Sequence, residues 1–122
     1  MKILKLDPGE IPEKIEINGS LESMQTLVGG MIQAVYPFHD PVALICNDEG
    51  KLLGLPYNRV LREPESGRAY DIVCGTCFLC GAPQDTDHFT SLTPEQLARY
   101  TDYYRHPELF LQTENGIVVL NI

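Results

Sequence analysis

The chain has 122 residues, of which 43% are apolar, so it is long enough for one domain with a buried core and too short for two sizeable ones. Its 17 acidic and 9 basic residues give a formal net charge of -8, which argues against binding to the nucleic-acid backbone or to an anionic membrane surface. No run reaches the roughly 18 apolar residues of a membrane span, and no secretion signal opens the chain, so we expect a cytoplasmic protein with reduced cysteines.

The first thirty or so residues predict a β-hairpin followed by a short helix. Residues 1–6 and 14–18 alternate charged with apolar side chains, and the turn signal Asp7-Pro8-Gly9 lies between them. Ser20 is the predicted N-cap of the helix, because its hydroxyl can accept a free amide hydrogen of the first turn. Gly29-Gly30 ends the helix, since glycine tolerates the left-handed cap conformation.

The middle of the chain predicts further strands. Residues 31–38 form one strand, and the fully apolar stretch 42–46 (VALIC) forms the next. The turn Asn47-Asp48-Glu49-Gly50 then predicts that residues 51–55 fold back on 42–46 as a hairpin. Residues 56–68 are polar and interrupted by proline and glycine, so we expect a surface loop there.

The C-terminal part predicts a strand, a second helix and a last strand. Residues 72–80 carry no charge and predict a β-strand. Thr93-Pro94-Glu95-Gln96 is a capping box that starts a helix, and Asn115-Gly116 is a turn before a strand at 117–122. Two helices and many strands grouped as hairpins predict an α+β fold: a mostly antiparallel sheet with both helices packed on it, in a single domain over 1–122.

The stretch CGTCFLCG, residues 74–81, holds three of the four cysteines. The spacing allows a zinc site formed by Cys74, Cys77 and Cys80, or a redox dithiol. In a strand, however, Cys77 points away from the face shared by the other two, which lie roughly 20 Å apart. A second cysteine pair is also absent from the sequence. We therefore favour a strand with buried thiols, keep zinc as the alternative, and expect no cofactor.

Few polar residues suggest a binding site. Asn58 and Arg59 follow a predicted hairpin, and the guanidinium of Arg59 has the geometry to grip a carboxylate or phosphate. A simpler interpretation is that Asn58 caps a helical turn and that Arg59 pairs with a nearby glutamate. We name four candidate ligand-binding residues: Asn47, Tyr57, Asn58 and Arg59. No nucleophile elbow, phosphate loop or other catalytic constellation is evident, so we do not expect an enzyme.

Four stretches, in this order, carry a family resemblance: LVGGMI (27–32), CNDEGKL (46–52), GLPYNR (54–59) and YDIVCGTC (70–77). The chain resembles the family catalogued as domain of unknown function 3846, from about Met1 through the capped helix near Thr93. The resemblance implies a small protein of Gram-positive bacteria, phages or conjugative elements, and it implies no catalytic residue. Family members usually look apolar at the cysteine positions, which weakens a shared metal role.

Together these observations predict a non-enzymatic binding or accessory module of a mobile genetic element. Its partner would be an unknown protein or a small ligand, without direct contact to nucleic acid or membrane. A second hypothesis is inhibition of host defence, with the chain acting as an acidic DNA mimic or capturing a nucleotide signal. A third is a zinc-binding module.

Overall fold

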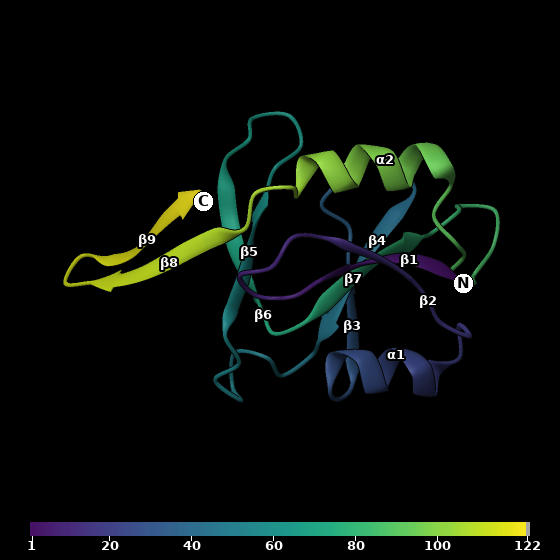
Figure 1. Ribbon diagram of the computed structural model, residues 1–122, viewed down its shortest axis with the longest axis horizontal. Coiled ribbons are helices and arrows are strands. Elements are labelled where there is room, and N and C mark those ends of the chain that lie inside the picture. The colour runs from purple at the N-terminus through teal and green to yellow at the C-terminus, as the bar shows by residue number, and fades with distance from the viewer. Residues whose placement is uncertain (122) are drawn as a thin grey trace.

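A five-stranded antiparallel sheet lies at the centre of the computed structural model, which describes residues 1–121 (Figure 1). The strand order is β2-β1-β7-β4-β3, and every neighbouring pair is antiparallel. The strands are β1 (Lys2–Leu6), β2 (Glu13–Glu16), β3 (Ile32–Val35), β4 (Val42–Asn47) and β7 (Cys77–Gly81). The predicted α+β fold with a mostly antiparallel sheet is confirmed, as is the hairpin of β1 and β2.

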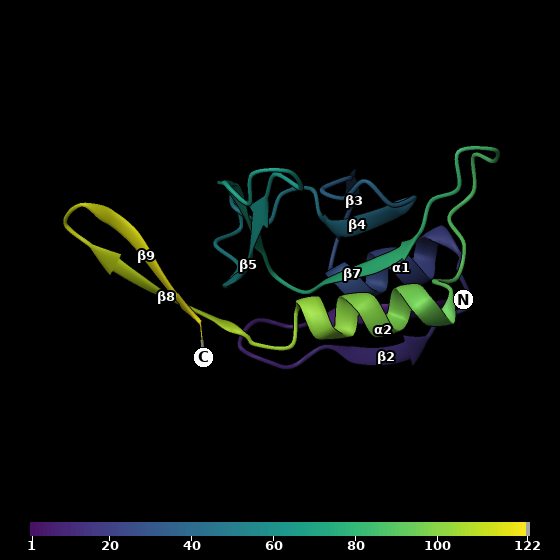
Figure 2. The same ribbon diagram turned by 90° about the horizontal axis from the view of Figure 1, so that it is seen from above.

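The two helices cover opposite faces of this sheet (Figure 2). Helix α1 (Leu21–Val28) packs Met24 and Val28 into a core that includes Ile45 and Phe78. Helix α2 (Pro94–Tyr103) lies over the other face, where Tyr100 and Tyr104 pack in a core that includes Leu44 and Leu79. Successive side chains of a strand point to opposite faces, so β4 and β7 each contribute side chains to both cores. Both strands are buried along their whole length.

Both predicted helix caps are present. The Ser20 hydroxyl accepts the Ser23 amide at 3.0 Å, and Gly29 closes α1 with a φ of +80°. At the start of α2, Thr93 Oγ1 accepts the Gln96 amide at 3.1 Å while Gln96 Oε1 accepts the Thr93 amide at 2.9 Å. These local hydrogen bonds set where each helix begins against the sheet.

The predicted hairpin of 42–46 with 51–55 is wrong. β4 pairs instead with β3 and β7, and residues 48–54 curl into consecutive turns. The Leu53 amide donates to Glu49 O at 2.9 Å, and the Gly54 amide donates to Lys51 O at 3.1 Å. The apolar Leu52 therefore stands 86% exposed rather than pairing with β4.

The predicted surface loop at 56–68 is also wrong. Strand β5 (Tyr57–Arg62) pairs antiparallel with β6 (Ala69–Cys74) to form a separate hairpin beside the central sheet (Figure 1). Val60 and Leu61 are buried there, and only residues 63–68 form the connecting turn. A register irregularity between Tyr57 and Arg59 leaves Asn58 without a partner residue on β6, and both Asn58 and Arg59 are buried.

The predicted strand over 72–80 is in fact two strands of different sheets. β6 ends at Cys74, β7 begins at Cys77, and Gly75 between them has a φ of +84°. A Cβ atom at Gly75 would lie 2.7 Å from Leu55 Cδ1, so any other residue there would displace the Leu55 side chain as well as strain the backbone at this φ. The chain changes sheets at this point.

A last hairpin joins β8 (Glu108–Thr113) to β9 (Gly116–Asn121) and projects from the body of the protein (Figures 1 and 2). The predicted strand at 117–122 is thus found, except that Ile122 lies outside the described residues. Over residues 1–121, neither helix has the length and apolar character needed to cross a membrane.

Candidate functional site

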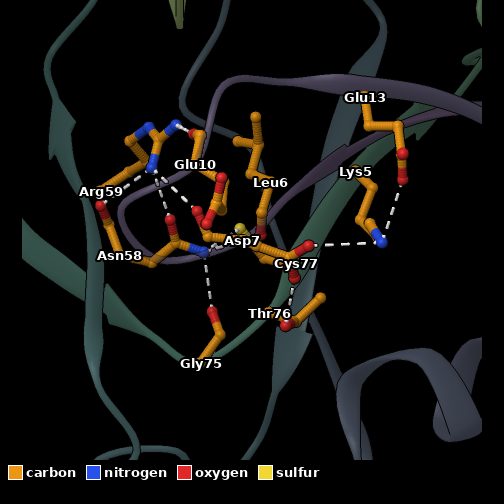
Figure 3. A network of polar contacts seen from close by, with 10 residues as sticks. All are labelled: Lys5, Leu6, Asp7, Glu10, Glu13, Asn58, Arg59, Gly75, Thr76 and Cys77. Atoms are coloured by element: carbon orange, nitrogen blue, oxygen red, sulfur yellow. Dashed lines mark hydrogen bonds and ion pairs between the residues drawn. The ribbon is translucent and has the colours of Figure 1, made fainter. Parts of the chain in front are cut away.

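Asn58 lies in the interior, where its side-chain amide joins three segments that are distant in sequence. It is fully buried, and its Nδ2 donates to Leu6 O and to Gly75 O, both at 2.8 Å (Figure 3). These bonds tie the end of β1 and the link between β6 and β7 to β5. The predicted role of Asn58 as the cap of a helical turn is wrong, because the residue stands in a strand.

Arg59 is a buried cation, with 1% of its surface exposed. Its Nη1 donates to Asn58 Oδ1 at 2.7 Å, and its Nη2 donates to Glu10 O at 2.6 Å (Figure 3). Longer bonds from Nη1 reach Asn58 O at 3.2 Å and Asp7 O at 3.4 Å. Burial lowers the pKa of the guanidinium below its ordinary value, and the carbonyl dipoles around it offset the missing hydration.

Side chains of other segments also hold the turn at residues 7–10, whose carbonyl groups bind Arg59. Thr76 Oγ1 donates to Asp7 Oδ1 at 2.6 Å, and Lys5 Nζ lies 3.3 Å from Asp7 and 3.1 Å from Glu13. Figure 3 shows this set as one network around the turn after β1. The amide of Asn58 and both Nη atoms of Arg59 bond to other parts of the chain, while Arg59 Nε is buried without a hydrogen-bond partner. This burial fits a structural role and leaves neither side chain open to a ligand.

Asn47, at the end of β4, is also occupied by protein contacts. Its Nδ2 donates to Val28 O at 3.2 Å, and its Oδ1 accepts the Glu49 amide at 2.8 Å. One side chain thus satisfies a carbonyl at the C-terminus of α1 and starts the turns at 48–54. A Cβ at Gly30 would lie 2.9 Å from that Nδ2, so a larger residue at 30 would displace the Asn47 side chain.

Of the four predicted ligand-binding residues, Tyr57 is the one that lines an open groove. An open groove of about 810 Å³ lies between the β5–β6 hairpin, the segment 51–56 and strand β9. We call it the tyrosine groove. Its lining is mostly apolar, with two tyrosines and one ion pair: Lys51, Gly54, Leu55, Pro56, Tyr57, Val60, Ala69, Tyr70, Asp71, Ile72, Cys74, Ile117 and Val119.

The two tyrosines give the groove its character. Tyr57 is 40% exposed and Tyr70 is 52% exposed. The centroid of the Tyr57 ring lies 5.4 Å from the centroid of the Phe110 ring of β8. Burial together with the negative charges of Asp71 and Glu63 raises the pKa of Tyr70. Lys51 forms an ion pair with Asp71, and that hydrogen bond raises the pKa of the lysine. The groove is therefore aromatic and apolar, and Asp71, its one lining carboxylate among the described residues, is ion-paired with Lys51, which also lines it.

The three cysteines of residues 74–80 do not share one site, although Cys46 lines a small pocket together with Cys74. Cys77 packs in the core under α2, Cys80 packs in the core under α1, and Cys74 lines the groove at the end of β6. Burial raises the pKa of Cys80 to about 12, and burial with nearby carboxylates raises that of Cys46 to about 11. Both remain protonated near neutral pH, which makes them poor nucleophiles. Within residues 1–121 no set of three His, Cys, Asp or Glu side chains is placed to hold a metal ion.

Among the groove residues, the sequence predicted Tyr57 as a ligand-binding residue and Cys74 only as an alternative zinc ligand. Tyr70, Lys51 and Asp71 were missed, as were Ile117 and Val119 from the last hairpin. These side chains come from three segments that meet only after folding. An exposed tyrosine beside an aspartate is too common in sequences to mark such a site alone.

The family model described as "Domain of unknown function (DUF3846)" matches residues 1–105 of the 122. The matched part includes both helices and strands β1 to β7, and it leaves the β8–β9 hairpin outside. Searches of the curated proteins and of the solved structures each returned no match. Since the match covers most of its length, the chain belongs to the DUF3846 family.

Proposed function

We propose that this DUF3846 protein is a non-enzymatic binding module that holds a basic, partly apolar segment of a partner protein in the tyrosine groove. The observation that carries the proposal is that two exposed tyrosines line one open, mostly apolar groove. A cation over a tyrosine face is attracted by the ring, and the attraction is stronger where the cation is desolvated. Lysine or arginine side chains of a partner fit this surface.

The shape of the groove favours a chain segment over a small molecule. Small-molecule sites enclose most of their ligand, whereas this groove is open to solvent. Apolar side chains of a bound segment would pack on Leu55, Ile72 and Val119, while its basic side chains reach the tyrosines. The net charge of -8 would speed the approach of a cationic partner.

The cellular setting is part of the proposal. Family members look like products of phages and conjugative elements, so we place the module in the cytoplasm as an accessory protein of a mobile genetic element. The buried, protonated thiols and the structural use of Asn58 and Arg59 support a role in binding rather than in catalysis.

Fluorescence anisotropy with designed peptides tests the groove. The probe is a labelled peptide that alternates arginine with leucine, compared with the same peptide carrying glutamate in place of arginine. We expect the arginine peptide to bind and the glutamate peptide not to bind. Tyr70→Ala and Tyr57→Ala should each weaken binding about 5- to 30-fold, which corresponds to roughly 1–2 kcal/mol of lost cation–π and packing contact.

Tyr36→Ala is the matched control, because Tyr36 is 62% exposed and lies outside the groove. All three substitutions leave the net charge unchanged, so general attraction of a basic peptide to an acidic protein cancels in the comparison. Equal affinities for the wild type, Tyr57→Ala and Tyr70→Ala would refute the proposal.

A further inference from the structure

The β8–β9 hairpin, here called the arm, forms one wall of the tyrosine groove. It leaves the body of the protein beside β5, where the Phe110 ring packs against Tyr57 (Figures 1 and 2). Ile117 and Val119 of β9 line the groove. The register pairs Phe110 with Val119, so these side chains lie on one face of the arm, and that face is turned towards the body.

The β5–β6 hairpin forms the other wall. Tyr70, Ile72 and Cys74 stand at alternate positions of β6, and all three line the groove. Alternate residues of a strand lie on one face about 7 Å apart, so these side chains make a row. Ile117 and Val119 make a shorter row of the same spacing on the arm. Two rows, each with a period of two residues, therefore border the groove.

The two walls differ in chemistry. Both groove tyrosines stand on the hairpin wall, together with Asp71, which pairs with Lys51. Among the described residues, the arm contributes Ile117 and Val119 to the lining, and both are aliphatic. A cationic side chain is attracted by the tyrosine rings, whereas against the aliphatic wall it would lose hydration without compensation. The hairpin wall therefore favours cations, and the arm wall favours apolar side chains.

We infer that the partner segment lies extended in the groove, with its basic side chains on the tyrosines and its apolar side chains on Ile117 and Val119. Successive side chains of an extended chain point to opposite sides, so alternate residues meet the two walls at the spacing of the two rows. The residues on one face of a helix are three or four positions apart, which does not match these rows. The inference rests on the proposed function and adds that the arm sets the specificity for apolar side chains.

The arm lies outside the part of the chain that the family model matches. The match ends at residue 105, and β8 begins at Glu108. The two tyrosines of the groove thus belong to the DUF3846 domain, while the residues that select apolar side chains belong to the segment that follows it. A substitution on the arm wall should therefore change the preference for apolar side chains and leave the attraction of cations to the tyrosines in place.

Fluorescence anisotropy with the full chain tests this arrangement. Val119→Ala shortens a side chain of the arm wall and should weaken binding of the alternating arginine–leucine peptide about fivefold. Val118→Ala is the matched control, because Val118 is 44% exposed on the other face of the same strand, and it should change the affinity less than about twofold. With an alternating arginine–alanine peptide, Val119→Ala should also have less than about a twofold effect, whereas Tyr70→Ala should weaken both peptides alike. Matching thermal melts confirm that the variants are folded.

A peptide of the same composition, with arginines and leucines in adjacent pairs, tests the extended conformation. Each wall would then meet both kinds of side chain, so this peptide should bind at least about fivefold more weakly than the alternating one. Equal affinities of the two peptides, equal effects of Val119→Ala and Val118→Ala, or a loss in Val119→Ala that persists with the arginine–alanine peptide would each overturn the inference, even if Tyr70→Ala still weakens binding. If the tyrosine variants bind as the wild type does, the proposed function fails and the inference fails with it.

Discussion

Replacing Asn58 by alanine tests whether the network around β5 holds the fold together. The substitution removes the two 2.8 Å bonds to Leu6 O and Gly75 O and the 2.7 Å bond from Arg59. Arg59 keeps other carbonyl acceptors, but the two backbone carbonyls lose their amide donor in a fully buried site. Each unsatisfied buried group costs roughly 1–3 kcal/mol, so we expect Asn58→Ala to destabilise by about 3 kcal/mol.

Urea unfolding followed by far-ultraviolet circular dichroism measures this loss. With a urea dependence of about 1.5 kcal/mol per molar, the midpoint should fall by about 2 M. Asn115→Ala removes the same amide from an exposed turn and should shift the midpoint by less than about 0.3 M. A loss below about 1 kcal/mol for Asn58→Ala would refute the reasoning, because water or movement would then be satisfying the carbonyls.

Two further predictions concern the stretch 74–81 and the buried thiols. Gly75→Ala should destabilise by about 3 kcal/mol, since the alanine would be strained at a φ of +84° and its Cβ would lie 2.7 Å from Leu55 Cδ1. Gly67→Ala, with a φ of +72° and open space around it, should cost only about 1 kcal/mol in the same melts; equal losses would show that the contact with Leu55 is unimportant. Stability should also fall in alkali, because burial raises the pKa of Cys46 to about 11 and that of Cys80 to about 12 from an ordinary 9.0. The folded state holds these protons longer than the unfolded state, so their contribution is complete below pH 9 and is lost as pH rises through 9 to 12. Urea midpoints at several pH values should therefore decline less steeply for Cys46→Ala than for the wild type, and parallel curves would contradict the assignment.

Local signals predicted local structure well. Ser20 and Thr93 begin their helices because each cap is made by residues three positions apart, which any reader of the sequence can see. The hairpin of β1 and β2 followed from alternation around a strong turn. The family resemblance rested on motifs within the matched range and is confirmed.

Long-range pairing was the part that local patterns did not predict. The turn residues after β4 are compatible with a hairpin, yet β4 pairs with β7, whose partner residues are 33 to 39 positions away, because both strands are apolar on both faces. Asn58 and Arg59 look like loop residues, since their partners Leu6, Glu10 and Gly75 are far away in sequence. The tyrosine groove could not be predicted from local patterns for the same reason, because its lining residues from β6 and β9 come together only in the folded chain.

The position of β7 has a consequence for how the chain reaches its native state. β7 lies between β1 and β4, so the N-terminal strand finds its central partner only when residues 77–81 are present. During synthesis, more than half of the chain must leave the ribosome before the sheet can close. Until then β1 and β4 each have an open apolar edge, and the closing step joins ends of a loop of about seventy residues. Topology of this kind slows folding and prolongs the exposure of a nascent chain to chaperones and aggregation.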